Sequence, residues 1–380
     1  MLEASKQHTT VKELGLPRRK RTSMSHDTIP NLLSLRGPRS ASGRGRTTAP
    51  PGFPSRATND QAIQGTDDDA AASRLSAVSL GYLQDSFAQY FVQTQASLAP
   101  RRTYTRTCAL NQLVDSFLAE DDRSFPNQSK ERQIISLGAG TDTRIFRIFG
   151  GRACHNLTYH ELDFPVTVTK KSRLVSAIPH MRRVLGEQVP QPDGSWSCRP
   201  PSGGEYYCHG IDLRELPQGG NSQLKGLKNN VPTLLISECC LCYLEASAAE
   251  STVQWFAKQI ENLALVVYEP IRPHDPFGKM MVSNLAARRI RMPTLESYPL
   301  PADQEARLRT AGFKHASAQT IEYIWENWVS PQERERVNGL EGLDEVEEWQ
   351  LLADHYVVAW AWRGEGFGGW QGACNNDESR

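Results

Sequence analysis

The chain has 380 residues, of which 39% are hydrophobic and 23% are charged, a composition typical of a soluble globular protein. This length buries a substantial core, and a single α/β domain with ordinary connections accommodates it. No stretch approaches the roughly 18 to 20 consecutive apolar residues that a membrane helix requires, and the N-terminus lacks the pattern of a secretory signal. We therefore expect a soluble, cytoplasmic protein with no membrane partner.

The charges are balanced in total but unevenly distributed along the chain. Lys and Arg number 43, and Asp and Glu also number 43. Residues 1–60 contain 11 basic and 4 acidic residues, a net charge of +7, so the remainder carries −7. A folded body with a net negative charge does not favour a basic surface for nucleic acid, and we expect no nucleic-acid partner.

The eight cysteines follow no repeating framework, and a chain of this length folds without covalent cross-links. We therefore expect reduced thiols. Their spacing also lacks the paired pattern of a zinc site, so we expect no metal. The cluster of Cys239, Cys240 and Cys242 is best interpreted as packing, because buried thiols behave as small hydrophobic groups.

Residues 1–70 are rich in Ser, Thr, Pro, Gly and Arg and predict a disordered basic tail. Such a composition buries too little apolar surface to offset the entropy of the unfolded chain. The basic quartet at residues 18–21 is most simply a solvated part of this tail. A phosphate-binding arm, or a localisation signal that adds the nucleus to the cytoplasm, is the alternative. We place the folded domain at residues 71–370.

The folded part predicts an α/β protein. Apolar residues at helical spacing from Ala77 to Leu118, interrupted at Pro100, predict two helices before the first strand. Short β-rich runs then alternate with helical stretches, which indicates a parallel sheet covered on both faces. The Pro-, Gly- and Ser-rich residues 179–204 predict an insertion over one face. The strands predicted for this seven-stranded, doubly wound sheet are Ile134–Leu137, Leu157–Leu162, Tyr206–Ile211, Thr233–Ser237, Leu263–Tyr268, Ala318–Ile324 and His355–Trp362.

The first predicted strand ends in a turn that contains Gly138 and Gly140. Glycine lets the chain turn tightly and lets a ligand approach the main chain, and such turns lie at the carboxyl edge of a doubly wound sheet. A dinucleotide site would need a third glycine where this chain has Thr143, and Asp142 would repel a pyrophosphate. The loop therefore favours a sulfonium cofactor with an amino group over NAD or ATP, with a purely structural turn as the alternative.

Acidic residues follow three other predicted strands. We prefer Asp163 to Glu161 as a ribose ligand because Asp163 lies nearer the strand tip. Asp212 can accept a hydrogen bond from an adenine amino group while Leu213 covers the ring, although capping of a helix is an equally good interpretation. Glu238 ends an apolar strand, where its charge needs a partner such as a cofactor ammonium group. The glycine turn and these acids are what a pocket for S-adenosylmethionine requires.

Four separated segments, SLGAGTDTR, YHELDFP, LLISECCLCYL and YEPIRPHDPFGKMMVSNL, occur here in an order that resembles the leucine carboxyl methyltransferase family. The resemblance extends from about Ala77 to Trp362. It implies a class I S-adenosylmethionine-dependent methyltransferase fold with extra N-terminal helices and S-adenosylmethionine as cofactor. It also implies an enzyme that methylates the α-carboxylate of the C-terminal leucine of the protein phosphatase 2A catalytic subunit, giving a methyl ester. We expect the phosphatase tail as partner and a monomeric enzyme.

The resemblance also implies site residues. Arg74 stands where the family often has lysine, and Arg101-Arg102-Thr103 replaces the usual Asn-Arg-Gly. With Gly140 of the turn added, the expected cofactor-binding residues are Arg74, Arg106, Gly138, Gly140, Asp163, Asp212, Leu213 and Glu238.

The expected chemistry needs no general base. A C-terminal carboxylate, with a pKa of about 3.5, is already ionised at neutral pH. Transfer from a sulfonium to a carboxylate neutralises opposite charges, so geometry and desolvation should provide most of the catalysis. We expect Arg106 to hold the carboxylate with a bidentate fork and Tyr243 to add a hydroxyl, with core packing as the alternative for Tyr243.

Three other functions are alternatives to this one. A small-molecule O-methyltransferase of the same fold would need a base near the methyl group, and no candidate is evident. A relative that modifies a guanosine in transfer RNA would carry a long C-terminal repeat domain. A non-catalytic adaptor that kept the fold would be expected to lack Gly138, Asp163 or Glu238, and all three are present.

Overall fold

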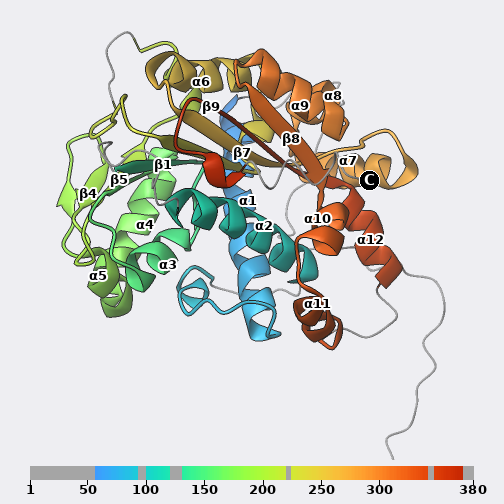
Figure 1. Ribbon diagram of the computed structural model, residues 1–380, viewed down its shortest axis with the longest axis horizontal. Coiled ribbons are helices and arrows are strands. Elements are labelled where there is room, and N and C mark those ends of the chain that lie inside the picture. The colour runs from blue at the N-terminus through green and yellow to red at the C-terminus, as the bar shows by residue number, and fades with distance from the viewer. Residues whose placement is uncertain (1–55, 93–99, 120–130, 220–223, 341–345, 371–380) are drawn as a thin grey trace, which may run out of the picture. The chain divides into compact units, whose positions relative to one another are not determined.

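The computed structural model describes residues 56–92, 100–119, 131–219, 224–340 and 346–370. A nine-stranded sheet with helices on both faces occupies the centre of this part of the chain (Figure 1). Its strands are β1 (Arg132–Leu137), β2 (Leu157–Asp163), β3 (Val189–Pro190), β4 (Trp196–Cys198), β5 (Glu205–Gly210), β6 (Thr233–Glu238), β7 (Leu263–Pro270), β8 (His315–Thr320) and β9 (Tyr356–Arg363).

The helices connect the strands and add two layers to the sheet. The α-helices are α1 (Arg56–Ser79), α2 (Pro100–Ala119), α3 (Arg144–Gly151), α4 (Pro165–Ala177), α5 (Pro179–Leu185), α6 (Ala246–Gln259), α7 (Pro276–Ala287), α8 (Pro293–Ser297), α9 (Pro301–Thr310), α10 (Ile321–Asn327), α11 (Pro331–Asn338) and α12 (Val346–Asp354). The 3₁₀ helices are η1 (Ala88–Tyr90), η2 (Leu213–Glu215), η3 (Leu241–Tyr243) and η5 (Gly368–Trp370). Within the described ranges, no helix combines the length and hydropathy of a membrane span.

The strand order is β3-β4-β5-β2-β1-β6-β7-β9-β8. Strands β5, β2, β1, β6 and β7 are parallel, and β9 lies antiparallel between β7 and β8. The order reverses at β1, because β2 and β5 lie on one side of it and β6 and β7 on the other. This confirms the predicted doubly wound α/β fold, and such a reversal opens a crevice at the carboxyl ends of the strands where ligands bind.

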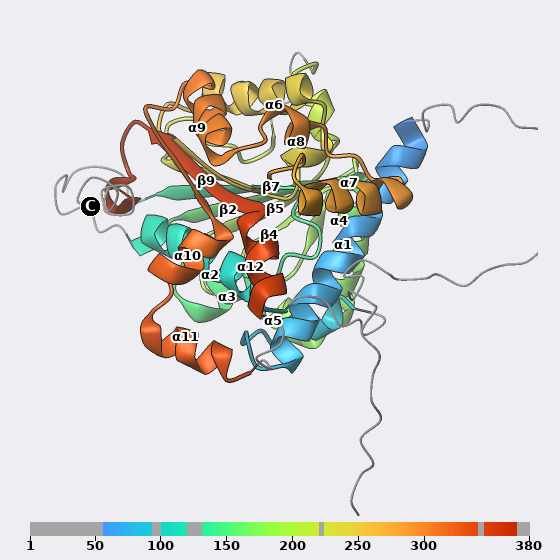
Figure 2. The same ribbon diagram turned by 90° about the vertical axis from the view of Figure 1, so that its right-hand side faces the viewer.

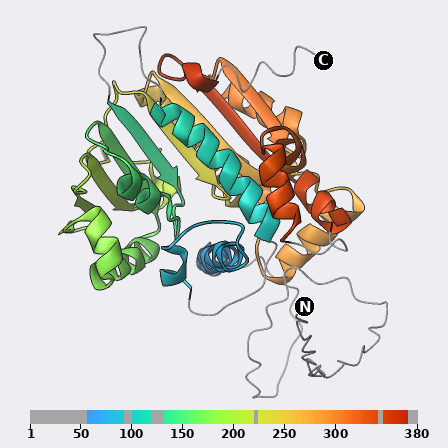
Figure 3. The same ribbon diagram turned by 60° about the horizontal axis from the view of Figure 1, so that its bottom comes forward.

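Two apolar cores lie on opposite faces of the sheet. Successive side chains of a strand point to opposite faces, so Ile134 of β1 packs in one core with Leu110 of α2, and Ile135 packs in the other with Phe256 of α6. Figure 2 shows α6 and α9 above the sheet and α2, α3 and α10 below it. Figure 3 shows α2 lying along the sheet. The burial of both faces explains the nearly continuous apolar character of the central strands.

The sheet has nine strands instead of the predicted seven. The expected insertion at residues 179–204 forms α5 and the short strands β3 and β4, which extend the sheet antiparallel to β5. Trp196 of β4 is 1% exposed and its ring centroid lies 5.1 Å from that of Tyr206 on β5. The insertion therefore lengthens the sheet at its edge because a buried tryptophan attaches it to β5.

The predicted strand Ala318–Ile324 is shifted. Strand β8 ends at Thr320, whose side chain accepts a hydrogen bond from the backbone N–H of Tyr323 at 3.1 Å. This N-cap starts α10 at Ile321, so the apolar residues after Thr320 are helical. The other predicted strands all lie within or overlap observed strands.

The predicted end of the tail at residue 70 is wrong, because α1 begins at Arg56. Polar contacts fix this segment instead of apolar packing: Asp60 accepts hydrogen bonds from Arg214 at 2.8 and 2.9 Å, and Asp67 accepts one from the N–H of Thr141 at 2.7 Å. Residues 1–55, with the basic quartet, lie outside the described residues.

The first of the two helices predicted between residues 77 and 118 is also wrong. Helix α1 ends at Ser79, Gly81 follows with φ of +84°, and Asp85 accepts hydrogen bonds from the N–H groups of Phe87 and Ala88 to start the short η1. The second predicted helix is confirmed as α2, with Pro100 at its first position, where a missing N–H costs nothing.

Candidate active site

The turn after β1 is tight and closely packed. Gly138 and Gly140 have φ of +61° and +44°, a region that disfavours side chains. A Cβ atom at Gly138 would clash with Cys240, and one at Gly140 would clash with the carboxylate of Asp67. The backbone thus requires glycine at both positions, and the packing of Cys240 against the turn agrees with its interpretation as an apolar residue.

Asp163 lies beside this turn at the end of β2. Its carboxylate oxygens accept hydrogen bonds from the N–H of Gly140 at 2.8 Å and the N–H of Phe164 at 2.7 Å. Burial and the charge of Asp67 together raise the pKa of Asp163 to about 6, against the effect of the two N–H groups and of a hydrogen bond from the side chain of Thr167. A carboxylate has about four acceptor sites, so with these three donors Asp163 can still accept a hydrogen bond from a ribose hydroxyl.

Glu161, the alternative to Asp163, lies two residues before it on β2, in the protein interior. It is 1% exposed, accepts a hydrogen bond from the hydroxyl of Tyr206 at 2.7 Å and pairs with Lys171 at 2.6 Å. Burial raises the pKa of Glu161 even though the Lys171 ammonium group lowers it. Glu161 is therefore committed to a buried pair, and Asp163 is the acid that reaches the sheet edge.

Helix α1 contributes a carboxylate that the sequence did not single out. Asp67 Oδ1 accepts hydrogen bonds from the backbone N–H of Thr141 at 2.7 Å and from its hydroxyl at 2.8 Å. Burial raises the pKa of Asp67. Asp67 thus joins α1 to the glycine turn, on the side from which Gly140 exposes its backbone.

Glu238, at the end of β6, is neutralised by two arginines of this chain. Its carboxylate lies 2.8 Å from Arg106 Nε, off the direction of a hydrogen bond, and accepts a hydrogen bond from Arg144 at 2.9 Å. Burial opposes ionisation of Glu238, but Arg106 and Arg144 lower its pKa below the ordinary value. The charge at the strand end therefore has internal partners before any ligand binds.

Arg144 connects Glu238 to a second acid. It also forms an ion pair with Asp142, whose pKa is lowered by Arg144 and Arg74 although burial opposes this. Arg74 of α1 lies 3.7 Å from Asp85. The predicted residues Arg74, Arg106 and Glu238 therefore meet in one network of alternating charges, and Arg144, immediately after the glycine turn in the segment SLGAGTDTR, is the member that sequence reasoning missed.

The remaining predicted residues occupy two separate places. Asp212 caps η2 by accepting a hydrogen bond from the N–H of Arg214 at 3.0 Å, as one of its two interpretations predicted, and Leu213 is 7% exposed. Tyr243 of η3 is partly buried, and its hydroxyl interacts with Thr66 of α1. Burial raises the pKa of Tyr243 well above its ordinary value, so it is a neutral donor.

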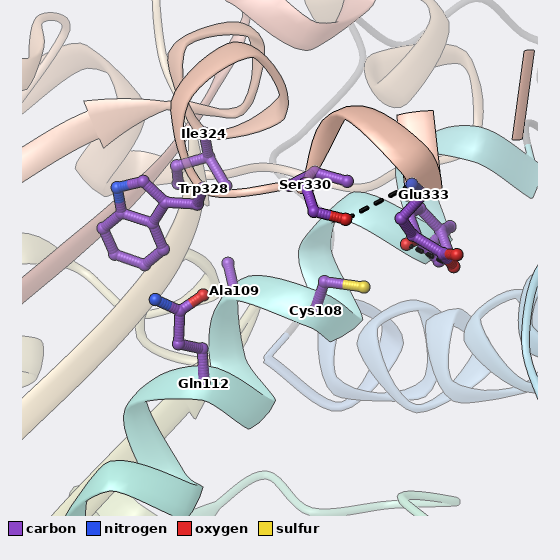
Figure 4. A pocket seen from close by; sticks show the side chains of 9 residues that line it. Cys108, Ala109, Gln112, Ile324, Trp328, Ser330 and Glu333 are labelled. Carbon is purple, nitrogen blue, oxygen red and sulfur yellow. Dashed lines mark hydrogen bonds between the residues drawn. The ribbon is translucent and has the colours of Figure 1, made fainter. Parts of the chain in front are cut away.

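A separate cavity of about 170 Å³ lies between α2 and α10 (Figure 4). Three of its polar side chains are paired with each other or with the backbone: the hydroxyl of Tyr104 donates to Glu333 at 2.9 Å, and Ser330 accepts from the N–H of Glu333 at 3.3 Å. Tyr104 and Cys108 lie on the side of α2 opposite to Arg106, because residues two apart are about 200° apart on a helix. We therefore place the site at the sheet edge and not in this cavity.

The residues at the edge fit S-adenosylmethionine. Its methionyl part carries an ammonium and a carboxylate group, which match Glu238 and the surrounding arginines. The buried Nε of Arg144 has no hydrogen-bond partner, so a donor remains in this network. Asp163 has lone pairs for the ribose, and the glycine turn exposes backbone between them.

Sequence comparisons agree with this assignment. The model of the family described as "Leucine carboxyl methyltransferase" matches residues 62–257. A leucine carboxyl methyltransferase 1 from Emericella nidulans is 43% identical over 369 residues, which cover 90% of this chain and 95% of the relative. One from Schizosaccharomyces pombe is 36% identical over 303 residues, covering 79% and 94%. The human tRNA wybutosine-synthesizing protein 4 is 32% identical over 315 residues, covering 82% of this chain and 45% of that protein.

The matched segment begins within α1 and ends within α6, and so contains the glycine turn, Asp163, Asp212 and Glu238. The chain belongs to the leucine carboxyl methyltransferase family, which consists of S-adenosylmethionine-dependent carboxyl methyltransferases.

Proposed function

We propose that this chain methylates the α-carboxylate of the C-terminal leucine of the protein phosphatase 2A catalytic subunit, giving a methyl ester. The observation that carries the proposal is the convergence of the glycine turn, Asp163 and Glu238 at the carboxyl edge, within the segment that matches the family. Family membership supports a leucine carboxylate as acceptor. The identity of the phosphatase is the part of the proposal that the experiment below tests.

When bound, S-adenosylmethionine supplies a methyl group on a positively charged sulfur. Asp163 orients the ribose, and Glu238, held between Arg106 and Arg144, orients the amino-acid part. The acceptor carboxylate is ionised at neutral pH, so this chain needs to position and desolvate it and does not need to remove a proton. The buried arginines offset the cost of desolvating that anion.

The test uses the purified full-length protein, radiolabelled S-adenosylmethionine and the phosphatase catalytic subunit with or without its terminal leucine. We expect label on the intact subunit only, and we expect mild base to release it, because carboxyl methyl esters are base-labile. Asp163→Ala serves as the inactive control. Label that resists base, or that persists on the subunit without its leucine, would contradict the proposal.

A further inference from the structure

Helix α2 presents two arginines one turn apart toward a pair of stacked tyrosines. The guanidinium carbon of Arg106 lies 5.4 Å from the ring centroid of Tyr268, and that of Arg102 lies 4.8 Å from the ring centroid of Tyr356. The two rings are stacked, with centroids 5.3 Å apart and planes 14° from parallel. Residues four apart share a face of a helix, so both guanidinium groups lie on the same side of α2.

The two arginines differ in their partners. Arg106 has Glu238, whereas no carboxylate among the described residues forms an ion pair with Arg102. The Nε of Arg102 is buried and has no hydrogen-bond partner, while the residue as a whole is only partly buried. Arg102 is therefore a partly exposed cation whose buried Nε is a donor without a partner.

The neighbouring charges balance one another without Arg102. Arg74, Arg106 and Arg144 are matched in the network by the carboxylates of Asp85, Asp142 and Glu238. Arg102 adds a further positive charge beside Arg106, and like charges at this distance repel. A partly buried cation without a carboxylate partner carries a desolvation cost, and an incoming anion would reduce that cost.

A second donor beside Arg102 also lacks a partner. Tyr268 is 0% exposed, and its buried hydroxyl makes no hydrogen bond within the described part of the chain. Tyr268 and Tyr356 both interact electrostatically with Arg102, and the side chain of Arg102 is also hydrogen-bonded to Tyr356. A guanidinium that has no carboxylate partner, beside a phenol hydroxyl that makes no hydrogen bond, is a donor set for one carboxylate, because the guanidinium fork matches two carboxylate oxygens.

The place of this donor set along the sheet edge indicates which carboxylate it binds. The strands run β5, β2, β1, β6, β7 and β9, and the predicted cofactor residues Asp212, Asp163, Gly138 and Glu238 follow β5, β2, β1 and β6 in that order. Tyr268 and Tyr356 lie farther along, on β7 and at the start of β9, where Tyr356 is opposite Pro270. With the ribose at Asp163 and the amino-acid part at Glu238, Arg102 would lie beside the methionyl half of the cofactor, which carries the transferable methyl group, so a carboxylate held by Arg102 would be close to that group.

We propose that Arg102, with the hydroxyl of Tyr268, binds the terminal carboxylate of the acceptor peptide and holds it for methyl transfer. The inference rests on the proposed function and goes beyond it, since the sequence assigned this task to Arg106. Arg106 is already paired with Glu238 and so belongs with the cofactor residues. The carboxylate of the cofactor's methionyl group has the same chemistry as that of the acceptor, and the experiment separates these two sources.

The experiment measures binding to the full-length protein. A fluorescent peptide that reproduces the phosphatase tail and ends in a free leucine carboxylate is compared with the same peptide ending in a carboxamide, both with saturating S-adenosylhomocysteine. We expect the parent protein to bind the free acid about 10- to 100-fold more tightly, the range for a charged hydrogen-bonded pair. Arg102→Gln should abolish this preference and leave the Kd of S-adenosylhomocysteine within about twofold, as measured by calorimetry.

Two further variants control for folding. Arg102→Lys keeps the charge and should keep part of the preference for the free acid. Arg147→Gln removes an exposed arginine that pairs with Asp115 on the surface and should change neither Kd. Thermal unfolding of each variant establishes that it is folded, and Arg102→Lys provides the comparison if Arg102→Gln does not fold.

The outcomes separate a failure of the proposed role of Arg102 from a failure of the proposed function. If Arg102→Gln keeps the full preference for the free acid, the proposed role of Arg102 is overturned. If it weakens S-adenosylhomocysteine binding and keeps that preference, the carboxylate at Arg102 is that of the cofactor, which also overturns it. If the parent protein itself makes no distinction between the two peptides, the proposed function fails, whatever Arg102 does.

Discussion

Asp67 and Asp163 accept hydrogen bonds from consecutive backbone amides of the glycine turn. The N–H of Gly140 donates to Asp163 at 2.8 Å and the N–H of Thr141 donates to Asp67 at 2.7 Å. One acid comes from α1 and the other from the end of β2, so the turn fixes two carboxylates that repel each other. Each is partly buried, and the pKa of each is raised by desolvation.

This pair predicts a pH-dependent affinity for the cofactor. Asp163 has a pKa of about 6, and protonation removes acceptors that the ribose hydroxyls need. We expect the affinity for S-adenosylhomocysteine to fall as the pH decreases through about 6. Asp67→Asn removes the neighbouring charge, lowers the pKa of Asp163 and should move the midpoint of this fall to lower pH. Calorimetric titrations between pH 5 and 8 measure both midpoints, and identical midpoints would contradict the coupling.

The same raised pKa has a consequence for stability. The folded pKa of Asp163 lies above its ordinary value of 3.8, so the folded state binds this proton more tightly than the unfolded state. The contribution of Asp163 to stability is therefore present below about pH 4 and is lost as the pH rises through about 6. The free energy of unfolding, measured with urea, should decrease less between about pH 4 and 6 in Asp163→Asn than in the parent protein.

Gly138→Ala tests the close packing of the turn. Gly138 and Gly194 both have positive φ, but a Cβ at Gly138 meets Cys240, whereas a Cβ at Gly194 meets nothing within 4 Å. Gly194→Ala should cost about 1 kcal/mol from backbone strain alone. Gly138→Ala should cost about 1–3 kcal/mol more and weaken S-adenosylhomocysteine binding at least tenfold. Equal losses in urea unfolding would show that the clash is relieved without cost.

Arg144→Gln tests the charge network. Arg144 is the residue that pairs with both Asp142 and Glu238, and removal of one member of a buried ion pair costs about 3–5 kcal/mol. The double variant Arg144→Gln/Asp142→Asn should recover part of this loss, because it removes one uncompensated charge. Arg147→Gln on the same helix is the matched control and should cost about 0–1 kcal/mol, since its pair with Asp115 is exposed. Additive effects in the double variant would argue against the network.

Lys171→Met tests the buried pair below the site. Lys171 and Glu161 are 2.6 Å apart and almost fully buried, so the single variant leaves Glu161 without its cation and should lose about 3–5 kcal/mol. Lys171→Met/Glu161→Leu should be close to the parent protein in stability, because apolar side chains replace both charges. If the single and double variants unfold at the same urea concentration, the pair contributes little.

The sequence predicted the strands well because burial on both faces leaves a strong apolar pattern. It located the acids of the site for a related reason: a charge such as Glu238 or Asp163 at the end of an apolar run marks a strand end. The errors came from local signals that compete with this pattern. Thr320 caps a helix inside an apolar run, and Asp85 caps η1 where apolar spacing predicted a helix.

The contacts between distant segments could not be predicted from the sequence. Asp67 reaches the glycine turn from α1, a polar helix that composition assigned in part to the tail. Arg144 was visible beside the turn and next to Asp142, but its pairing with Glu238 of β6 depends on the fold. Arg102 looked like a departure from the family pattern, and only the position of Tyr268 and Tyr356 gives it a role.

The most direct test of the central claim is to locate the methyl group on the acceptor by tandem mass spectrometry. The full-length protein is incubated with S-adenosylmethionine and two peptides that reproduce the phosphatase tail, one with a free C-terminal leucine and one with a C-terminal amide. The account predicts one added methyl group, on the terminal carboxyl of the free-acid peptide, and none on the amide. A methyl group on a side chain, or equal methylation of both peptides, would contradict it.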